Sequence, residues 1–211
     1  MTDKYKIWVD EAWRGPWAGP VVAAAFCFDP SNPISKNIIS QINDSKKLTE
    51  KKREQLYPIL VEKGLFWVGV VDNYVIDNIN IRQANKEAMR RAIVELKRKI
   101  PKKSQLIVEI DWRDNYVFDE LKNQPSYIVW GDGKVTEIWA ASIIAKVFRD
   151  KLMVAYSTLY PKFGFETNAG YGTKKHKDHL LEPWDITGIH RASYKPVQAV
   201  AEKKMKTPKN K

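Results

Sequence analysis

The chain has a single cysteine, Cys27, among its 211 residues, so an intramolecular disulfide is excluded. Cys27 lies in the apolar segment VVAAAFCF, where we expect a small buried side chain rather than a reactive thiol. The sequence has no run of about 18 apolar residues and no apolar leader after Met1, which argues against a membrane span or a secretion signal. We therefore expect a soluble cytoplasmic protein.

Acidic residues are outnumbered: 25 Asp and Glu stand against 36 Lys and Arg, for a formal net charge of +11. Residues 202–211 hold five Lys and one Glu, a net +4, so the rest of the chain keeps +7. This excess favours a polyanionic partner and salt-sensitive phosphate contacts. The Lys-rich stretch 201–211 has little to bury, so we predict a disordered basic tail there.

Short apolar segments alternate with helical patterns along the chain. The segments predicted as strands are residues 5–10, 20–28, 65–71, 105–111 and 126–130. Thr49 is a suitable N-cap for the first long helix, and Pro101 stops the second. The predicted helices cover residues 50–63, 79–100 and 137–156. This order favours an α/β fold: a mixed five-stranded sheet flanked by helices, with a small C-terminal helical cap.

Carboxylates stand at the ends of three of these strands. Asp10 and Glu11 form an adjacent pair at the end of the first strand, Asp111 ends the fourth strand, and Asp132 follows the fifth. Strand ends converge on one crevice in an open sheet, so these side chains can share a cluster. Carboxylate oxygens bind Mg²⁺ or Mn²⁺ and leave positions open for water and a phosphate.

A longer pattern surrounds these carboxylates. Residues 10–25 read DEAWRGPWAGPVVAAA. Further motifs follow in order: NDSKKLTEKKRE (43–54), QANKEAMRRAI (83–93), EIDWRDN (109–115), WGDGKVTEIWAASIIAKVFRD (130–150), GYGTKKH (170–176) and IHRASYKPV (189–197). With these motifs the chain resembles the type 2 ribonucleases H, and specifically bacterial ribonuclease HII. Only the ends and a few loops fall outside the resemblance.

The resemblance implies a ribonuclease H-like catalytic domain over residues 1–200, including the helical cap. It implies an endonuclease that hydrolyses the RNA strand of RNA/DNA hybrids and cuts at single ribonucleotides embedded in duplex DNA, in replication and repair. The chemistry would be two-metal-ion catalysis with Mn²⁺ or Mg²⁺, leaving 5′-phosphate products. We expect a monomer that associates with no membrane. The family's catalytic and metal-binding carboxylates map onto Asp10, Glu11, Asp111 and Asp132.

The family's substrate-binding residues map onto several loops. The turn that senses ribose falls on Trp13, Arg14 and Gly15, where backbone amides can reach a 2′-hydroxyl. Tyr171 resembles the family tyrosine that stacks on the sugar at the RNA-to-DNA junction; the alternative is a tyrosine that packs a glycine turn. The candidates for phosphate contacts are Lys46, Lys47, Lys174 and Arg191. Each of these four could equally be a solvated surface charge, and we interpret His190 as structural.

The chain departs from the family pattern at several tryptophans. Trp8, Trp13 and Trp112 stand where the family has glycine, and the chain has 8 Trp but only 10 Gly. Average glycine usage is about 7%. Glycine at such places allows a positive φ or a close backbone approach, and an indole allows neither cheaply. We hypothesise that these tryptophans are UGA codons from a lineage that reads UGA as glycine; UGG at all three positions would reject this.

A second class of function follows if the tryptophans are genuine. The chain would then be a catalytically impaired protein that holds hybrid duplexes without cutting them. The presence of all four carboxylates favours the enzyme, because a protein that only binds has no need for them.

Overall fold

The computed structural model describes residues 3–12, 14–42, 48–128, 136–182 and 188–206. These residues form two compact units whose segments interleave along the chain. The sheet unit comprises Met1–Ala12, Val22–Val70 and Asn85–Val147. The helical unit comprises Trp13–Val21, Val71–Ala84 and Phe148–Lys211.

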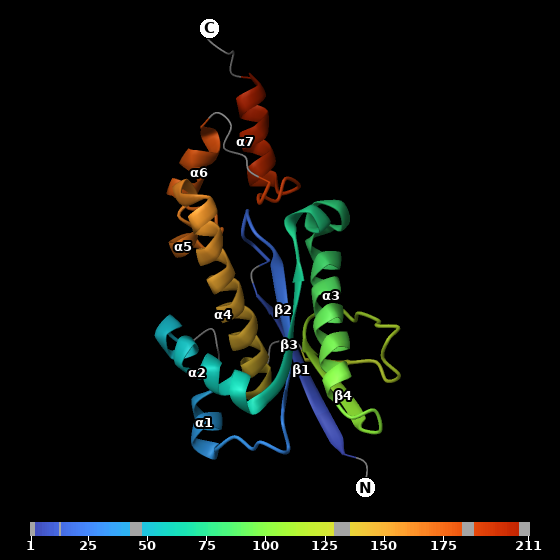
Figure 1. Ribbon diagram of the computed structural model, residues 1–211. Coiled ribbons are helices and arrows are strands. Elements are labelled where there is room, and N and C mark those ends of the chain that lie inside the picture. Colours follow the sequence, from blue (N-terminus) through green and yellow to red (C-terminus); the bar gives the residue numbers. More distant parts are fainter. Residues whose placement is uncertain (1–2, 13, 43–47, 129–135, 183–187, 207–211) are drawn as a thin grey trace. The chain divides into compact units, whose positions relative to one another are not determined.

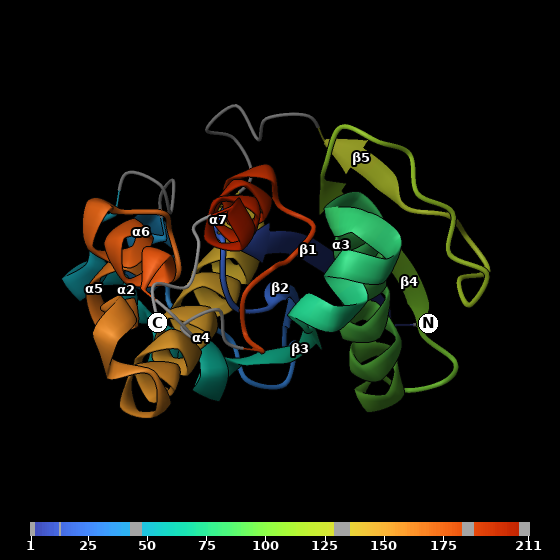
Figure 2. The same ribbon diagram turned by 90° about the horizontal axis from the view of Figure 1, so that it is seen from above.

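The sheet unit contains a mixed five-stranded sheet with the strand order β3-β2-β1-β4-β5 (Figures 1 and 2). β1 pairs antiparallel with β2 and parallel with β4, and β4 pairs parallel with β5. The strands are β1 (Lys4–Ala12), β2 (Val21–Phe28), β3 (Gly64–Val71), β4 (Gln105–Asp111) and β5 (Ser126–Ile128). The predicted mixed sheet is confirmed. The last two residues of the predicted fifth strand, 129 and 130, lie outside the described residues.

Helices cover both faces of this sheet. In the sheet unit, residues 85–99 of α3 (Asn73–Lys99) lie on one face and residues 136–147 of α4 (Thr136–Leu159) lie on the other (Figure 1). This two-sided cover explains why β2 is apolar along its whole length and buried from Val21 to Cys27. The unit also includes α1 (Lys36–Gln41) and α2 (Glu50–Lys63). None of the helices in the described ranges is long and apolar enough to cross a membrane.

Two helices show how local chemistry sets the boundaries. Helix α2 begins after Thr49, whose hydroxyl accepts a hydrogen bond from the Lys52 N–H, as predicted. Helix α3 begins at Asn73 rather than at the predicted residue 79, and it consists of two helical stretches, because the chain leaves helical geometry at Asn80 (φ 65°, ψ 163°). Asn80 Oδ1 then accepts the N–H groups of Arg82 and Gln83 and caps the second stretch. The apolar period identified only that second stretch.

Cys27 is buried in β2, with 1% of its surface exposed. Burial, and then the Asp29 carboxylate, raise the pKa of Cys27 to about 12. The residue therefore stays a neutral thiol at physiological pH, which confirms the prediction of a small buried side chain.

The helical unit has a core of its own. Its last part consists of a 3₁₀ turn η1 (Pro161–Phe163), α5 (Phe165–Asn168), α6 (Lys174–Leu181) and α7 (Lys195–Lys206). The buried side chains that pack together are Ala18, Met153, Phe163, Phe165, Leu180, Ile189 and Val200. These helices confirm the predicted C-terminal cap. The tail predicted to be disordered from residue 201 starts inside α7, so disorder is wrong for residues 201–206; the remaining five residues lie outside the described part.

Gly69 sits where β3 touches α3, and it supplies the first testable prediction. A Cβ built on Gly69 would overlap the carbonyl oxygen of Ala88 on α3. Because neither backbone can yield cheaply, we expect Gly69→Ala to lower the free energy of unfolding by about 1–3 kcal/mol. Chemical denaturation would measure this. Gly15→Ala is the control, since its Cβ would make only ordinary contact at 3.4 Å, and an equal loss in both variants would contradict the argument.

Candidate functional site

Two of the predicted carboxylates lie on neighbouring parallel strands, Asp10 near the end of β1 and Asp111 as the last residue of β4. The β1–β4 register pairs Val9 with Ile110, and both of these side chains are fully buried. The next residues, Asp10 and Asp111, therefore stand side by side on the opposite face of the sheet, on strands about 4.8 Å apart. The register brings together two residues that are about a hundred positions apart in the sequence.

The surroundings of Asp10 fix its carboxylate in place. Asp10 is 7% exposed, and its Oδ1 accepts the N–H of Glu11 at 2.8 Å. Glu11 and Asp111 are both half-buried. Carboxylates gathered at one strand end repel each other, and a divalent cation relieves that repulsion. The donors here are all carboxylate oxygens, which fits Mg²⁺ or Mn²⁺ and disfavours softer metals that prefer sulfur and nitrogen.

The fourth predicted carboxylate, Asp132, lies outside the described residues, as do Trp13, Lys46 and Lys47. Along the described ranges, no group of three or more Asp, Glu, His or Cys side chains lies close enough to hold a metal ion. The structure offers two features for the predicted metal site, the Asp10–Asp111 register and the neighbouring Glu11.

In the helical unit, the turn after β1 is fastened by two buried arginines. Arg191 Nε donates to Gly19 O at 2.9 Å, and its Nη groups donate to Pro20 O and Arg14 O at 3.0 and 2.8 Å. Arg149 donates to Pro20 O, Ala18 O and Ala169 O at 2.7–3.0 Å. Buried charges need such partners. These bonds connect residues 14–20 to Arg149 on α4 and to Arg191, which precedes α7.

Both guanidinium groups are fully buried, at 0% exposure. Burial, and then the positive charge of Arg191, lower the pKa of Arg149 to about 9. Burial also lowers the pKa of Arg191, against the opposing effect of Tyr194. The prediction that Arg191 contacts phosphate is therefore wrong: its side chain is enclosed and spends its donors on backbone carbonyls.

The structure brings Gly15 and Tyr171 together in the helical unit. A Cβ on Gly15 would lie 3.4 Å from Tyr171 Cε1, and 41% of Tyr171 is exposed. Arg14 is exposed as well, and its carbonyl oxygen accepts hydrogen bonds from Arg191 and from the Tyr194 hydroxyl. The exposed Lys174 is the first residue of α6. Four of the predicted substrate-binding residues, Arg14, Gly15, Tyr171 and Lys174, thus have accessible positions.

The family of the chain follows from its sequence. The ribonuclease HII family model matches residues 7–197. The chain belongs to the ribonuclease HII family. It is 45% identical to the ribonuclease HII of Lactobacillus johnsonii over 191 residues, which cover 90% of this chain and 70% of the relative. The ribonuclease HII of Clostridium acetobutylicum is 42% identical over 187 residues, which cover 88% and 70%.

Solved structures agree with this assignment. The ribonuclease H2 of Pyrococcus horikoshii is 26% identical, with a TM-score of 0.74 over 96% of this chain and 100% of that one. The ribonuclease HII in a PCNA complex from Archaeoglobus fulgidus is 25% identical, with a TM-score of 0.71 over 92% and 96%. A Bst ribonuclease HIII, solved in complex with Mn²⁺, shares the fold at 17% identity, with a TM-score of 0.78 over 98% and 72%. This ribonuclease HII homologue is thus a ribonuclease H enzyme.

Two of the unusual tryptophans are built into the core of the sheet unit. Trp8 is 6% exposed, and its Nε1 donates to Glu109 Oε2 at 3.1 Å. Trp112 is 7% exposed and stacks on Tyr116, with 5.7 Å between ring centroids. The backbone accommodates both indoles, although the ribonuclease HII pattern has glycine at these two positions. Trp13 lies outside the described residues.

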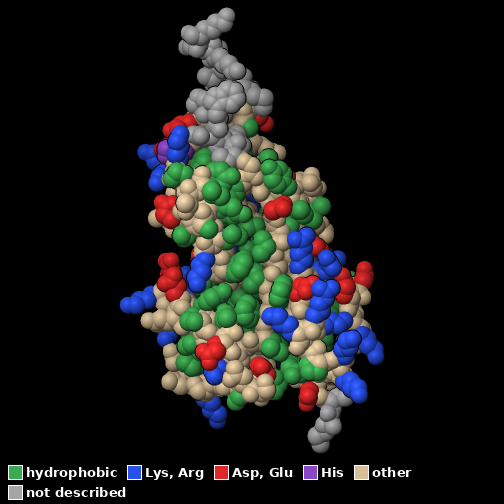
Figure 3. Space-filling model, in the orientation of Figure 1, with side chains coloured by type: hydrophobic (Ala, Val, Ile, Leu, Met, Phe, Trp, Pro, Cys, Tyr) green, Lys and Arg blue, Asp and Glu red, His purple; other side chains and the backbone are tan. Residues whose placement is uncertain are grey.

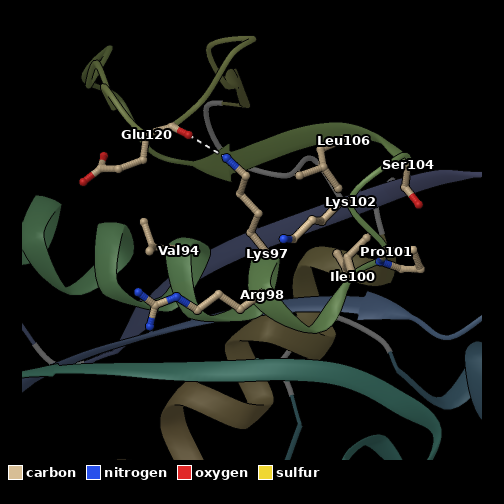
Figure 4. A pocket seen from close by; sticks show the side chains of 9 residues that line it. All are labelled: Val94, Lys97, Arg98, Ile100, Pro101, Lys102, Ser104, Leu106 and Glu120. Atoms are coloured by element: carbon tan, nitrogen blue, oxygen red, sulfur yellow. Dashed lines mark hydrogen bonds between the residues drawn. The ribbon is translucent and has the colours of Figure 1, made fainter.

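Basic side chains also gather away from the carboxylates. Figure 3 shows Lys and Arg on the side of the sheet unit formed by α3, where Arg90, Arg91 and Arg98 pair with glutamates. A cavity of about 380 Å³ lies at the end of α3, lined by Lys97, Arg98 and Lys102 together with apolar residues (Figure 4). Lys97 Nζ donates to Glu120 O at 2.7 Å across it. The cavity lies beside the first residues of β4, whereas Asp111 is the last residue of that strand. The cavity and the carboxylates are therefore at opposite ends of β4.

Sequence reasoning missed Arg149. Its signal was a charged residue within the nearly continuous apolar side of a helix, in the segment IIAKVFRD. A long cation at such a position needs buried acceptors. The acceptors are backbone carbonyls of distant segments, which no side-chain pattern reveals.

The second prediction separates the structural Arg191 from the exposed Lys174. We expect Arg191→Lys to lower the free energy of unfolding by about 2–4 kcal/mol, because an ammonium cannot reproduce the fork of donors to three carbonyls. The salt dependence of hybrid binding should not change. We expect Lys174→Gln to leave stability unchanged and to reduce the salt slope by about one charge if Lys174 contacts phosphate. Thermal unfolding measures stability, and binding titrations at several salt concentrations measure the salt slope. If Arg191 were the phosphate ligand, its substitution would reduce the salt slope and Lys174→Gln would not.

Proposed function

We propose that this protein is a divalent-metal-dependent endonuclease of hybrid duplexes. It hydrolyses the RNA strand of RNA/DNA hybrids and cuts at single ribonucleotides embedded in duplex DNA, in the removal of ribonucleotides during replication and repair. The observation that carries the proposal is the β1–β4 register, which sets Asp10 beside Asp111 at one end of the sheet. The cavity at the other end of β4 has no comparable set of acidic groups among its lining residues.

The proposed catalytic residues are Asp10, Glu11, Asp111 and Asp132, which would hold two Mg²⁺ or Mn²⁺ ions. Ions of this kind activate the attacking water and stabilise the charge on the leaving oxygen. The bond between phosphorus and the 3′-oxygen breaks, so the products are a 3′-hydroxyl and a 5′-phosphate. The buried Asp10, fixed by the Glu11 N–H, supports this role because its orientation is set before substrate binds.

We propose that recognition of ribose falls to the turn Trp13–Arg14–Gly15 and to Tyr171. A backbone amide within about 3 Å of the 2′-hydroxyl tells ribose from deoxyribose. The anchoring of residues 14–20 by Arg149 and Arg191 supports this role, because a sensing turn must keep its geometry in the free protein. Lys46, Lys47 and Lys174 are the proposed phosphate contacts.

The third prediction tests the metal site. We expect Asp111→Asn to lower the rate of hybrid cleavage by at least about a hundredfold. Loss of a direct metal ligand costs more activity than loss of a neighbouring group that only orients such a ligand. Hybrid affinity should stay the same or rise, since the change removes a negative charge. Asp119→Asn is the control: Asp119 is exposed, and the same charge is lost in the same unit. Near-normal turnover of Asp111→Asn with Mn²⁺ or Mg²⁺ would remove Asp111 from the proposed set.

The fourth prediction concerns substrate choice. With Mg²⁺ or Mn²⁺, the protein should cut an RNA/DNA hybrid and a DNA duplex with one ribonucleotide, and should leave all-DNA duplex intact. Labelled strands separated on a gel would show each product. Binding of the hybrid without cutting would instead support the catalytically impaired protein. Burial of the Trp112 indole in the core supports the enzyme, because that side chain does not stand free at the surface beside Asp111.

The fifth prediction returns to the tryptophans. If indoles at positions 13 and 112 crowd the reacting sugar, Trp13→Gly combined with Trp112→Gly should raise cleavage, most of all at a single embedded ribonucleotide. Because Trp112 is buried, we also expect this variant to lose about 3–5 kcal/mol of unfolding free energy. Activity must therefore be expressed per folded molecule. Equal activity of the two proteins on that substrate would reject crowding.

A further inference from the structure

Two histidines of the helical unit form a buried pair beneath Tyr171. His176 and His190 are 0% and 3% exposed, and their Nε2 atoms lie 3.0 Å apart. The Nδ1 atom of His176 lies 2.8 Å from the carbonyl oxygen of Tyr171. Aromatic rings enclose the His176 ring: the centroids of Trp17, Phe163 and Phe165 lie 5.4–5.6 Å from it.

The hydrogen-bonding partners fix the protons on both rings. A carbonyl oxygen only accepts, so His176 Nδ1 must carry a hydrogen and donate it to Tyr171. Burial lowers the pKa of His176, and the bond to the Tyr171 carbonyl opposes this effect, so the ring is neutral at neutral pH. A neutral His176 with its hydrogen on Nδ1 offers Nε2 as an acceptor. His190 must then carry its hydrogen on Nε2 and donate it.

The pair is itself anchored. Asn73 Nδ2 donates to the carbonyl oxygens of His190 and Gly188 at 3.1 and 2.7 Å. The backbone of Ala18 forms a bridge with His190, so the same segment also meets the turn that carries Gly15. The hydrogen-bonded chain therefore runs from α3 through His190 and His176 to Tyr171.

Further hydrogen bonds hold the backbone of Tyr171 and of its neighbour Gly170. Gly170, at φ +86°, accepts the N–H of Trp17 at 2.8 Å, and a Cβ there would meet Ala18 O at 2.6 Å. The Tyr171 N–H donates to Asn168 O, and the Tyr171 carbonyl also accepts the Thr173 N–H. The carbonyl is thus held from two sides, and the His176 ring is the side-chain member of this arrangement.

We propose that His176, whose Nδ1 donates to the Tyr171 carbonyl and whose Nε2 accepts from His190, is a positioning residue that holds Tyr171 against Gly15 for contact with the sugar next to the ribonucleotide. The inference rests on the proposed function, since it assigns Tyr171 to substrate. Neither histidine touches substrate. Each acts through the Tyr171 backbone, which orients the exposed ring.

Two substitutions at one position separate positioning from packing. His176→Phe keeps a ring of similar size among the aromatic neighbours but removes the donor to Tyr171. His176→Asn keeps an N–H near the place of Nδ1 but removes the aromatic packing. If the donor positions Tyr171, His176→Phe should raise the KM for an embedded single ribonucleotide about tenfold, with kcat within about threefold, while long-hybrid kinetics change little. His176→Asn should recover most of this loss, although it is the less stable of the two.

Tyr171→Ala completes a double-mutant cycle. If His176 acts through Tyr171, adding His176→Phe to Tyr171→Ala should cause no further loss on the embedded ribonucleotide. Additive losses would overturn the proposal, as would a KM that follows the stability of the His176 variants rather than the presence of the donor. If Tyr171→Ala itself leaves the KM unchanged, the proposed substrate role of Tyr171 fails, and the positioning proposal fails with it.

A measurement on the unaltered protein needs no activity. ¹⁵N NMR of histidine-labelled protein at neutral pH should show His176 protonated on Nδ1 and His190 on Nε2. The opposite tautomers, or free exchange between both forms, would overturn the proposed chain of hydrogen bonds whether or not the protein cleaves hybrids. With the expected tautomers but no cleavage of any substrate, the proposed function fails and the positioning of Tyr171 for a sugar falls with it.

Discussion

The parallel pairing of β1 with β4 is the constraint on which the site depends. It sets the register that places Asp10 beside Asp111, and it does so through the buried pair Val9 and Ile110 one step earlier. Side chains alternate along a strand, so a slip of one residue would send one carboxylate to the wrong face. The apolar core therefore fixes the relation between the two acidic groups. Helices cover both faces of the sheet, and β2 is apolar along its whole length as a result.

In the helical unit, polar side chains fix the position of the backbone. Arg149 and Arg191 are fully buried and bind carbonyl oxygens within residues 14–20, which come after β1 in the sequence. Asp77 adds a further tie, because its carboxylate accepts the N–H groups of Ala192 and Ser193 next to Arg191. A turn has no inter-strand hydrogen bonds of its own, so donors from elsewhere in the sequence must hold its shape. Cations suit this purpose, since one guanidinium reaches several carbonyls at once.

The two units thus reach order by different means. In the sheet unit, apolar burial and strand pairing decide where side chains stand. In the helical unit, hydrogen bonds from buried Arg, His and Asn side chains to backbone carbonyls do so around Tyr171 and Gly15. This difference explains why Asp10 and Asp111 stand together as predicted, whereas Arg191 is enclosed. A carboxylate at a strand end is placed by the strand, whereas a loop arginine is placed by whatever acceptors surround it.

The sequence by itself determined the five strands, helix α2 with its Thr49 cap, the buried Cys27 and the ribonuclease HII family, because these follow from local patterns and motif order. It missed the break at Asn80, which depends on a side chain capping the next turn, and it missed the extension of α7 to Lys206. Only the tertiary structure decided that Arg191 is enclosed, that Tyr171 lies against Gly15, and that His176 meets His190. Those facts join residues far apart in the chain, and their partners are mostly backbone carbonyls, which every residue carries and no sequence pattern marks.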